Sequence, residues 1–366
     1  MNIRADSDHR PAARGVLKRR RLLQWMSLLP LTSAAPALLA QAQNQAPPIP
    51  IHKLHTFSLR VSDVQRSVAF YQGLFGMAIQ ARQGESVCLQ IGDGPQFMTL
   101  VPLRRGETPG IRHIGISTPE FDLDELSNRF RAHDFAIIPQ PRPGHAPLEV
   151  ALRSWTVRRP VELDGRASST RDFYFADREG LVYQLCSMDH CGGSGSRGEI
   201  CNAIEPSPQQ GLMRLRDINH FTNFMSNSSR ANAFYTELFG LEYQAYQGPT
   251  MPIVGVGDGL QFLMYVGPNR EGVPEQAART DHVSLSVEEF SVEGVLEKLT
   301  QYGLSAREDS SSTPPLSHWV SLRMPERNGA EGGTPELYFS DPDGIHIQLQ
   351  HVSYCGGNGY FGEICS

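Results

Sequence analysis

The sequence lacks the motifs of nucleotide-dependent enzymes and of serine hydrolases. It has no glycine-rich phosphate-binding loop, no serine nucleophile elbow and no evident pair of catalytic carboxylates, and its Gly-Asp-Gly stretches are typical of turns beside strands. It also lacks an apolar run long enough to span a membrane, because the run from Trp25 to Ala40 is interrupted by Pro30 and Pro36. These absences argue against a nucleotide-dependent enzyme, a serine hydrolase and a protein that spans a membrane.

Positive charge is scarce outside the first segment of the chain. The 366 residues include 33 Lys/Arg and 39 Asp/Glu, which gives a formal net charge of −6. Residues 1–42 carry seven Lys/Arg and two Asp/Glu, a net +5, so the remaining residues carry −11. This acidic remainder argues against nucleic acid or an anionic membrane as a partner. A length of 366 residues with 40% hydrophobic content suits two ordinary globular domains.

The basic N-terminal segment is typical of an export signal. Four basic residues starting at Lys18 precede the short apolar run, and small residues follow it, so we expect cleavage after Ala40 or Ala42. Two arginines directly before Leu22 and Leu23 are similar to a twin-arginine signal, and a general secretory signal is the alternative. We therefore expect an export signal over 1–42, which the export machinery recognises, and a proline-rich leader over 43–51. The protein is expected to be periplasmic and to have no stable membrane anchor.

Cysteine is scarce but regularly placed. Four of the six cysteines bound two glycine-rich loops, Cys191 to Cys201 and Cys355 to Cys365. We expect a local disulfide in each loop, because neither has an obvious apolar core and an oxidising compartment permits the bond. Such a bridge contributes roughly 3 kcal/mol on the chain-entropy account. A metal–thiolate site is the alternative, although the spacing does not match that of zinc sites.

A long internal repeat sets the domain organisation. The stretch "DFYFADREGLVYQLCSMDHCGGSGSRGEIC" (172–201) is nearly copied by "ELYFSDPDGIHIQLQHVSYCGGNGYFGEIC" (336–365), and "SDVQRSVAFYQGLFGM" matches "SNSSRANAFYTELFGL" at the same offset. A repeat of this length indicates two related domains. The expected boundaries are a first domain over 52–201, a polar proline-bearing linker over 202–211 and a second domain over 212–366.

Each domain divides again into two modules. "LHTFSLRV" alternates as a strand, and Ser62 or Asp63 can then cap a helix that Gly76 ends. The apolar face of that helix contains Val64, Val68, Tyr71 and Phe75. Two strands joined by a Gly-Asp-Gly turn follow, and "RHIGIST" opens the next module. The predicted fold class is therefore α+β, with the order β-α-β-β-β repeated four times.

The first module resembles the glyoxalase module of the vicinal oxygen chelate superfamily. This superfamily includes glyoxalases, bleomycin resistance proteins and extradiol dioxygenases, and the resemblance covers roughly residues 52–190 and 217–354. It implies that the modules pair into two glyoxalase-like domains, arranged in tandem, whose cupped mixed sheets surround a metal. A chain of two such paired units is the arrangement found in the ring-cleaving extradiol dioxygenases.

The resemblance also implies which residues hold the metal, namely residues on the first strand of a module and on the last strand of its partner. These are His55, His113 and Gln184 in the first half, and His220, His282 and Gln348 in the second half. Strand alternation supports the assignment, because His282 shares a face with Ser284 and Ser286. His55 fits less well, since it shares its face with apolar residues.

Glutamine stands where the superfamily commonly has a glutamate ligand. A neutral amide oxygen can bind a cation but supplies no charge, so affinity should fall, and it cannot act as a general base. Glyoxalase chemistry is therefore disfavoured, whereas extradiol-like chemistry requires iron(II). The expected cofactor is a divalent metal, Fe²⁺ first, with Mn²⁺ or Zn²⁺ as alternatives.

Four further side chains are candidates for a catalytic role: His318, Tyr338, His346 and Glu363. Glu363 recurs as Glu199 in the other cysteine loop, and one hypothesis is that it restores the carboxylate that Gln348 removes. The alternative is a disulfide-stapled loop whose glutamate is solvated or caps a helix.

The expected function is that of an exported metal-dependent enzyme. We expect dioxygenase-like chemistry, or lyase chemistry second, on a small oxygen-bearing substrate, with aromatic compounds as one candidate class. The alternative is a non-catalytic periplasmic binding protein of the bleomycin-resistance type. The chain is expected to act as a monomer or a homodimer.

Overall fold

Two nine-stranded sheets, one from each half of the chain, organise the protein. The structure, a computed structural model, describes residues 47–139, 152–159, 169–269, 277–309 and 311–365. The predicted α+β class with two paired sheets is confirmed. The predicted export signal lies outside these described residues. Within them, no helix is both long enough and apolar enough to cross a membrane.

The first half follows the predicted module order. Its first module consists of β1 (Lys53–Val61), α2 (Val64–Phe75), β2 (Ile79–Gln83), β3 (Ser86–Gln90) and β4 (Phe97–Pro102). Its second module consists of β5 (Gly110–Thr118), α3 (Leu123–Ala132), β6 (Ala136–Ile137), β7 (Arg153–Arg158), β8 (Arg171–Ala176) and β9 (Val182–Ser187).

The second half repeats this order. Its first module consists of β10 (Leu215–Phe224), α4 (Ser228–Phe239), β11 (Tyr243–Tyr246), β12 (Pro252–Gly255) and β13 (Phe262–Val266). Its second module consists of β14 (Arg279–Val287), α5 (Val292–Gln301), β15 (Ser305–Ala306), β16 (Ser317–Arg323), the 3₁₀ turn η1 (Pro325–Arg327), β17 (Thr334–Ser340) and β18 (His346–His351). The two-residue strands β6 and β15 add to the predicted pattern.

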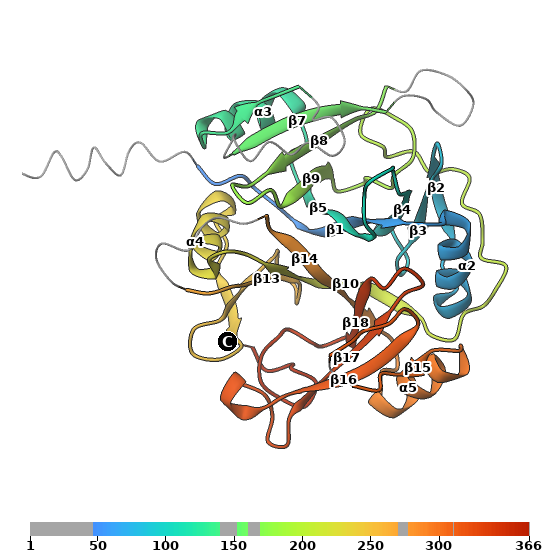
Figure 1. The fold of residues 1–366 in the computed structure, drawn as a ribbon. Helices are drawn as coiled ribbons and strands as arrows, with labels where there is room; N and C mark the ends of the chain where they lie inside the picture. The colour runs from blue at the N-terminus through green and yellow to red at the C-terminus, as the bar shows by residue number, and fades with distance from the viewer. Residues whose placement is uncertain (1–46, 140–151, 160–168, 270–276, 310, 366) are drawn as a thin grey trace, which may run out of the picture. The chain divides into compact units, whose positions relative to one another are not determined.

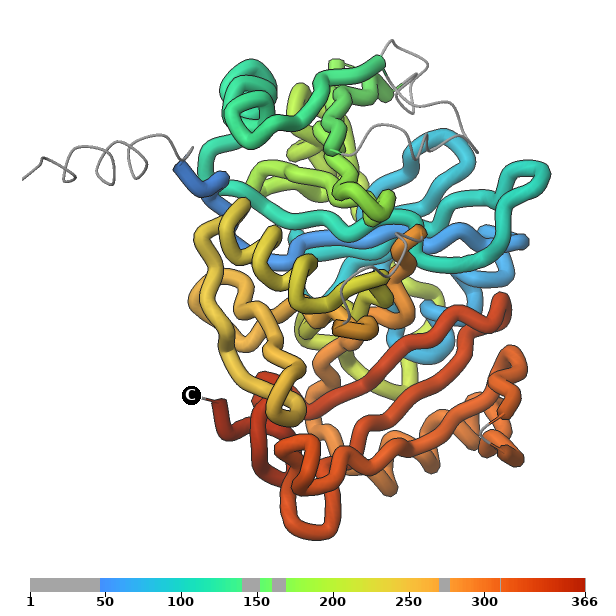
Figure 2. Tube along the Cα trace, turned by 60° about the vertical axis from the view of Figure 1, so that its left-hand side comes forward, coloured from blue at the N-terminus to red at the C-terminus, as the bar shows by residue number. Residues whose placement is uncertain are grey.

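The first strands of the two modules lie side by side at the centre of each sheet. The strand orders are β2-β3-β4-β1-β5-β9-β8-β7-β6 and β11-β12-β13-β10-β14-β18-β17-β16-β15. The central pair is antiparallel, whereas each central strand pairs in parallel with the last strand of its own module. Figures 1 and 2 show the neighbouring strands β16, β17 and β18 in the orange and red part of the chain.

The first helix of the first half begins and ends where the sequence predicts, and its counterpart in the second half is capped in the same way. The Asp63 side chain accepts a hydrogen bond from the backbone N–H of Arg66 at 3.0 Å, and α2 ends at Gly76 with φ +67°. Asn227 and Gly240 cap α4 in the same way. An Asp or Asn acceptor at the start and a left-handed glycine at the end are the favoured helix caps. Of the two predicted N-cap residues, Asp63 is the one used.

The two faces of each strand have different surroundings. On β14, Val283, Leu285 and Val287 are buried in the apolar core together with aliphatic residues of β18. His282 and the serines between these residues point to the opposite face because side chains alternate along a strand. We call this opposite face of each sheet its cup face, and in the second half His220, His282 and Gln348 lie on it.

A reciprocal pair of hydrogen bonds joins the two halves. The Tyr71 hydroxyl on α2 donates to the Asp341 carboxylate at 3.0 Å, and the Tyr235 hydroxyl on α4 donates to the Asp177 carboxylate at 2.7 Å. Each aspartate also accepts two backbone N–H groups of its own hairpin turn. The repeated turn therefore serves both its hairpin and the contact between the halves.

An acidic residue two positions after each of these aspartates strengthens the same contact. Arg66 lies 2.7 Å from Asp343, and Arg230 lies 2.9 Å from Glu179. Both acidic side chains are nearly buried, with exposed fractions of 5% and 4%. The sequence match between the two turns thus reflects a contact that is made twice across the chain.

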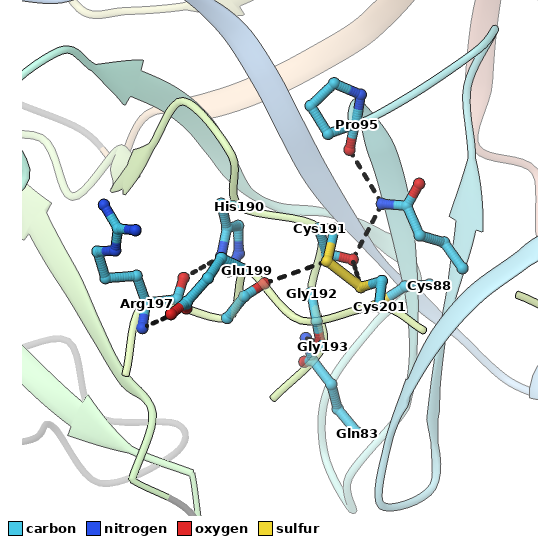
Figure 3. The surroundings of a disulfide bond; sticks show 12 residues. Gln83, Cys88, Pro95, His190, Cys191, Gly192, Gly193, Arg197, Glu199 and Cys201 are labelled. Atoms are coloured by element: carbon cyan, nitrogen blue, oxygen red, sulfur yellow. Dashed lines mark hydrogen bonds between the residues drawn. A yellow bond between two sulfur atoms is a disulfide. The ribbon is translucent and has the colours of Figure 1, made fainter. Parts of the chain in front are cut away.

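Both predicted local disulfides are confirmed. Cys191 pairs with Cys201 and Cys355 pairs with Cys365, each with a Cα–Cα distance of 6.2 Å. Figure 3 shows the first of them, with the free and buried Cys88 nearby. Because both bonds close loops of equal length, they offer a matched pair for experiments.

Candidate metal centre

The second half brings three predicted ligands to one place on its cup face. His220 on β10 pairs with Ser284 on β14, and Ser284 pairs in turn with Gln348 on β18. His282 lies two residues from Ser284 on the same face of β14. The rings of His220 and His282 are 5.7 Å apart between centroids at an interplanar angle of 79°. Two histidines and one glutamine from three adjacent strands therefore form a cluster.

Both imidazoles in this cluster are oriented through Nδ1. His220 Nδ1 lies 2.7 Å from Oδ1 of Asn219, and His282 Nδ1 lies 3.0 Å from a carboxylate oxygen of Asp281. These oxygens only accept, so Nδ1 is the donating nitrogen of each ring and Nε2 is the nitrogen left to bind a ligand. Hydrogen bonding at one ring nitrogen is how metal-binding histidines are usually oriented.

Gln348 presents an acceptor atom without a partner. Its Oε1 is buried and forms no hydrogen bond of normal geometry with any described residue. A side-chain hydrogen bond with Gln348 raises the pKa of His220, so the two side chains are close, although the contact does not meet the geometry of a normal hydrogen bond. An orphaned buried carbonyl oxygen is costly unless a ligand or ion meets it. This oxygen, together with the two Nε2 atoms, fits a divalent cation.

Burial keeps His220 neutral. Loss of solvation lowers the pKa of His220 well below its usual value, repulsion from His282 lowers it further, and Gln348 opposes this only in part. A neutral imidazole is the form that binds a cation. Among the described residues, no three His, Cys, Asp or Glu side chains form a metal cluster, so any site here needs the glutamine.

Aromatic side chains line the cup face beside this cluster. The Tyr338 ring meets His282 edge-on at 5.2 Å, and Trp319 of β16 stacks on Tyr338 at 5.3 Å. His346, which pairs with His282 across the strands, meets Trp319 edge-on at 5.3 Å. Burial, and then the charge of Glu336, raise the pKa of Tyr338 well above its usual value, so its hydroxyl stays protonated.

Two other predicted residues lie elsewhere. His318 stands on the opposite face of β16 from Trp319, and its Nε2 lies 3.2 Å from the Thr300 hydroxyl on α5. Glu363 is exposed within its loop, where its carboxylate accepts the backbone N–H of Phe361 at 2.9 Å. The structure does not bring either side chain to the cluster.

The first half has a different arrangement at the matching places. His113 Nε2 donates to Oε1 of Gln184 at 3.2 Å, and Nε2 of Gln184 donates to Asp172 at 3.1 Å. Ser58 occupies the other ring nitrogen of His113 at 3.1 Å. Burial lowers the pKa of His113 to about 3. Gln184 thus has protein partners for both amide atoms, whereas Gln348 does not.

His55 is offset by one residue from the position that corresponds to His220. Thr56 pairs with Phe97 of β4 in the way that His220 pairs with Phe262 of β13. His55 instead donates from Nε2 to the backbone carbonyl of His190 at 2.6 Å. Sequence alignment on the histidines alone conceals this shift of one residue in strand register.

Sequence reasoning missed a buried ion pair beside the second cup. Arg323 is fully buried, and its Nε donates to Glu336 at 2.9 Å. The Tyr354 hydroxyl also donates to Glu336, at 3.3 Å. The repeat contained a signal for this pair, because Arg159 and Asp172 stand at the matching positions and form the same contact at 2.9 Å.

A hollow of about 580 Å³ lies apart from both cups, around the end of α2 and the linker. Its lining residues include Phe75, Met77, Gln210, Met213 and Glu288. None of the predicted site residues lines it. We place the candidate site in the second cup because His220, His282 and Gln348 gather there.

Comparisons with known proteins agree with this architecture. Residues 53–148 match the family model described as Glyoxalase/Bleomycin resistance protein/Dioxygenase superfamily. No curated protein matches the sequence.

Solved structures of dioxygenases are similar over most of the chain. One is homoprotocatechuate 2,3-dioxygenase from Brevibacterium fuscum in an anaerobic complex with 3,4-dihydroxyphenylacetate, with a TM-score of 0.54 and 15% identity over 83% of this chain and 81% of that chain. Another is the 2,3-dioxygenase LapB from Pseudomonas sp. KL28, with a TM-score of 0.52 and 14% identity over 83% and 93%. Identities this low show the fold alone. The predicted resemblance is thereby confirmed: this chain has the tandem vicinal oxygen chelate fold of these dioxygenases, and its residues 53–148 match the superfamily's model.

Proposed function

We propose that the protein is a metal-dependent, dioxygenase-like enzyme whose reaction takes place in the second cup. The observation that carries this proposal is the unpartnered Oε1 of Gln348 beside two imidazoles that both have Nδ1 occupied. His220, His282 and Gln348 would hold the cation. When bound, a divalent cation supplies Lewis acidity toward substrate oxygens, and iron(II) adds the redox chemistry that dioxygen requires.

The chain's own residues prepare this site. Asp281 and Asn219 fix the two imidazole tautomers, so little reorganisation is needed when a ligand arrives. Trp319 and Tyr338 provide a stacked aromatic wall next to the cluster, which suits a flat substrate. Tyr338 keeps its proton, which its hydroxyl donates to Glu336 at 3.4 Å, so its contribution to the site is its ring face.

The substrate class follows from this wall and from the similar dioxygenases. One solved structure holds 3,4-dihydroxyphenylacetate, a ring with two adjacent hydroxyl groups. We propose a small aromatic compound with vicinal oxygens as the substrate, with lyase chemistry second. The solved structures named above are dioxygenases, so the alternative of a purely binding protein is not favoured.

Export is the remaining part of the proposal. Two disulfides suit an oxidising compartment. We propose that residues 1–42 direct the protein to the periplasm by the twin-arginine route. Replacing Arg20 and Arg21 together by lysine should then retain the protein in the cytoplasm, which cell fractionation would detect. Unchanged export would favour a general secretory signal instead.

The central test is binding of a divalent cation to the oxidised protein. Wild-type protein should bind one equivalent of Fe²⁺ anaerobically, or of Mn²⁺, in isothermal titration calorimetry. His282→Ala should abolish this binding, whereas His113→Ala, its counterpart in the first cup, should leave it intact. Equal binding by wild type and His282→Ala would refute the proposal, as would a wild-type protein that takes up no cation.

A further inference from the structure

The two disulfide loops have no role in the proposed function so far. We call residues 190–201 the first strap and residues 354–365 the second strap. Each follows the last strand of its half and is closed by one disulfide. Both contain the pattern Cys-Gly-Gly-x-Gly-x-x-Gly-Glu-Ile-Cys, so a shared structural need explains most of their sequence.

One side of the second strap is attached to β11, β12 and β13. Gln244 of β11 donates to the carbonyl of Cys355 at 2.9 Å. Gly356 lies so close to Ile253 of β12 and Phe262 of β13 that any side chain there would collide with them. Its φ of +81° also favours glycine. The strap therefore rests directly on this end of the sheet.

The other side of the second strap is attached to β16 and β17. The guanidinium of Arg323 donates to the carbonyl of Gly357 at 2.9 Å, and the Thr334 hydroxyl donates to the carbonyl of Gly359 at 2.7 Å. In the strand order, β16 and β17 lie on one side of the central pair β10 and β14, and β11, β12 and β13 lie on the other side. The second strap thus bridges two separated parts of one sheet, next to the candidate metal centre.

A direct chain of hydrogen bonds runs from this strap to a proposed ligand. The backbone carbonyl of Tyr354 accepts a hydrogen bond from Nδ2 of Asn219 at 2.8 Å. A carbonyl can only accept, so the contact fixes the Asn219 amide with its NH₂ group toward the strap. Its Oδ1 then faces Nδ1 of His220 at 2.7 Å and selects the tautomer that leaves Nε2 free. The Tyr354 ring also stacks on His220 at 5.6 Å.

The first strap makes the equivalent carbonyl contact without this relay. The carbonyl of His190 accepts from Nε2 of His55, which stands at the place of Asn219. Thr56 stands at the place of His220 and has no imidazole to orient. The first strap is therefore a matched control with the same disulfide spacing and the same anchoring carbonyl.

We propose that the second strap, through the Tyr354 carbonyl and the Asn219 amide, sets the tautomer of His220 and thereby the cation affinity of the second cup. Asn219 is a positioning residue in this view. The inference rests on the proposed function, because the affinity concerned is that of the cluster of His220, His282 and Gln348. The disulfide contributes by holding the strap in place.

The first experiment determines the tautomer without any metal. Protein labelled with ¹⁵N-histidine is studied by long-range ¹H–¹⁵N correlation NMR, and the His220 signal is assigned by its loss in His220→Gln. Wild type should show Nδ1–H. Asn219→Leu should shift His220 to Nε2–H, because the unpartnered Oε1 of Gln348 can accept that proton. Asn219→Asp keeps the acceptor and should retain Nδ1–H. An unchanged tautomer in Asn219→Leu would overturn the proposal.

The second experiment measures Mn²⁺ affinity by isothermal titration calorimetry. Asn219→Leu and the double variant Cys355→Ser/Cys365→Ser should bind Mn²⁺ about 10-fold to 100-fold more weakly, the usual effect of losing an orienting partner. Cys191→Ser/Cys201→Ser should lose a similar amount of thermal stability and keep its affinity. Equal affinity in all three variants would overturn the proposal.

The failure of this inference differs from the failure of the proposed function. A wild type that binds no Mn²⁺ refutes the metal site, while the NMR experiment still reports whether Asn219 controls the tautomer of His220. If the serine double variant does not fold, Asn219→Leu carries the test, because it leaves both disulfides intact.

Discussion

Replacing Asp341 by asparagine should change how the stability of the protein depends on pH. Asp341 is fully buried between the halves, and Asp177 is its counterpart with 4% exposure. Loss of solvation raises the pKa of each carboxyl from its usual 3.8 to about 6, although a tyrosine hydroxyl and two backbone N–H groups favour the charged form. Burial therefore outweighs three hydrogen bonds at both sites.

The sign and size of the effect follow from proton linkage. Between pH 3.8 and about 6 the folded protein retains a proton that the unfolded chain has released, so the free energy of unfolding falls as the pH rises through this window. A difference of roughly two pKa units corresponds to about 3 kcal/mol for each aspartate. Asparagine does not titrate, so the difference in unfolding free energy between variant and wild type should move by about 3 kcal/mol in favour of the variant from pH 3.5 to pH 7.5.

Urea denaturation followed by tryptophan fluorescence at four or five pH values measures this difference. Asp177→Asn should reproduce the curve, because its contacts mirror those of Asp341. Asp258→Asn, at an exposed position, is the control for replacing an aspartate outside the joint. If Asp341→Asn gives a flat difference, the buried carboxyl titrates normally and the reasoning from burial is wrong.

Three further predictions concern the second cup. Gln348→Glu should increase Mn²⁺ affinity by about tenfold or more, equivalent to ~1.4 kcal/mol, because it adds a charge beside the two imidazoles. Gln184→Glu should create no site in the first half, since Thr56 stands there in place of the histidine. Calorimetry measures both variants. Arg323→Met should lower the free energy of unfolding in urea by roughly 3–5 kcal/mol, because it leaves Glu336 buried without its partner, and a loss below 1 kcal/mol would contradict this. Glu363→Gln should leave Mn²⁺ affinity unchanged, because its carboxylate is exposed and bonded within its own strap; a clear loss would revive its role as a ligand.

The repeated architecture could be predicted from sequence because its signals are local. Alternating strands, an Asp or Asn cap and a terminal glycine define the first helix of each half within about twenty residues, and the structure uses Asp63 and Gly76 as expected. The local disulfides followed from spacing and glycine content. Such signals depend on neighbours in the chain, which a single sequence displays.

The details of the site depend on strand register and contacts between distant residues, which the sequence does not display. A shift of one residue places Thr56 rather than His55 opposite Phe97, and no composition pattern indicates it. The alternation on β16 could have assigned His318 and Trp319 to opposite faces, but it could not show which face carries the cluster. The contact of Asn219 with the carbonyl of Tyr354 joins residues 135 positions apart, so no local pattern indicates it.

The reciprocal contacts of Tyr71 with Asp341 and of Tyr235 with Asp177 make the two halves behave like the subunits of a fused twofold dimer. These four side chains contribute to the joint together with the Arg66–Asp343 and Arg230–Glu179 ion pairs, and none of them belongs to the cluster of His220, His282 and Gln348. Mutations inside one cup can therefore accumulate without loosening the dimer-like joint. Duplication of this kind gives a protein one copy that can diverge while the other retains its chemistry.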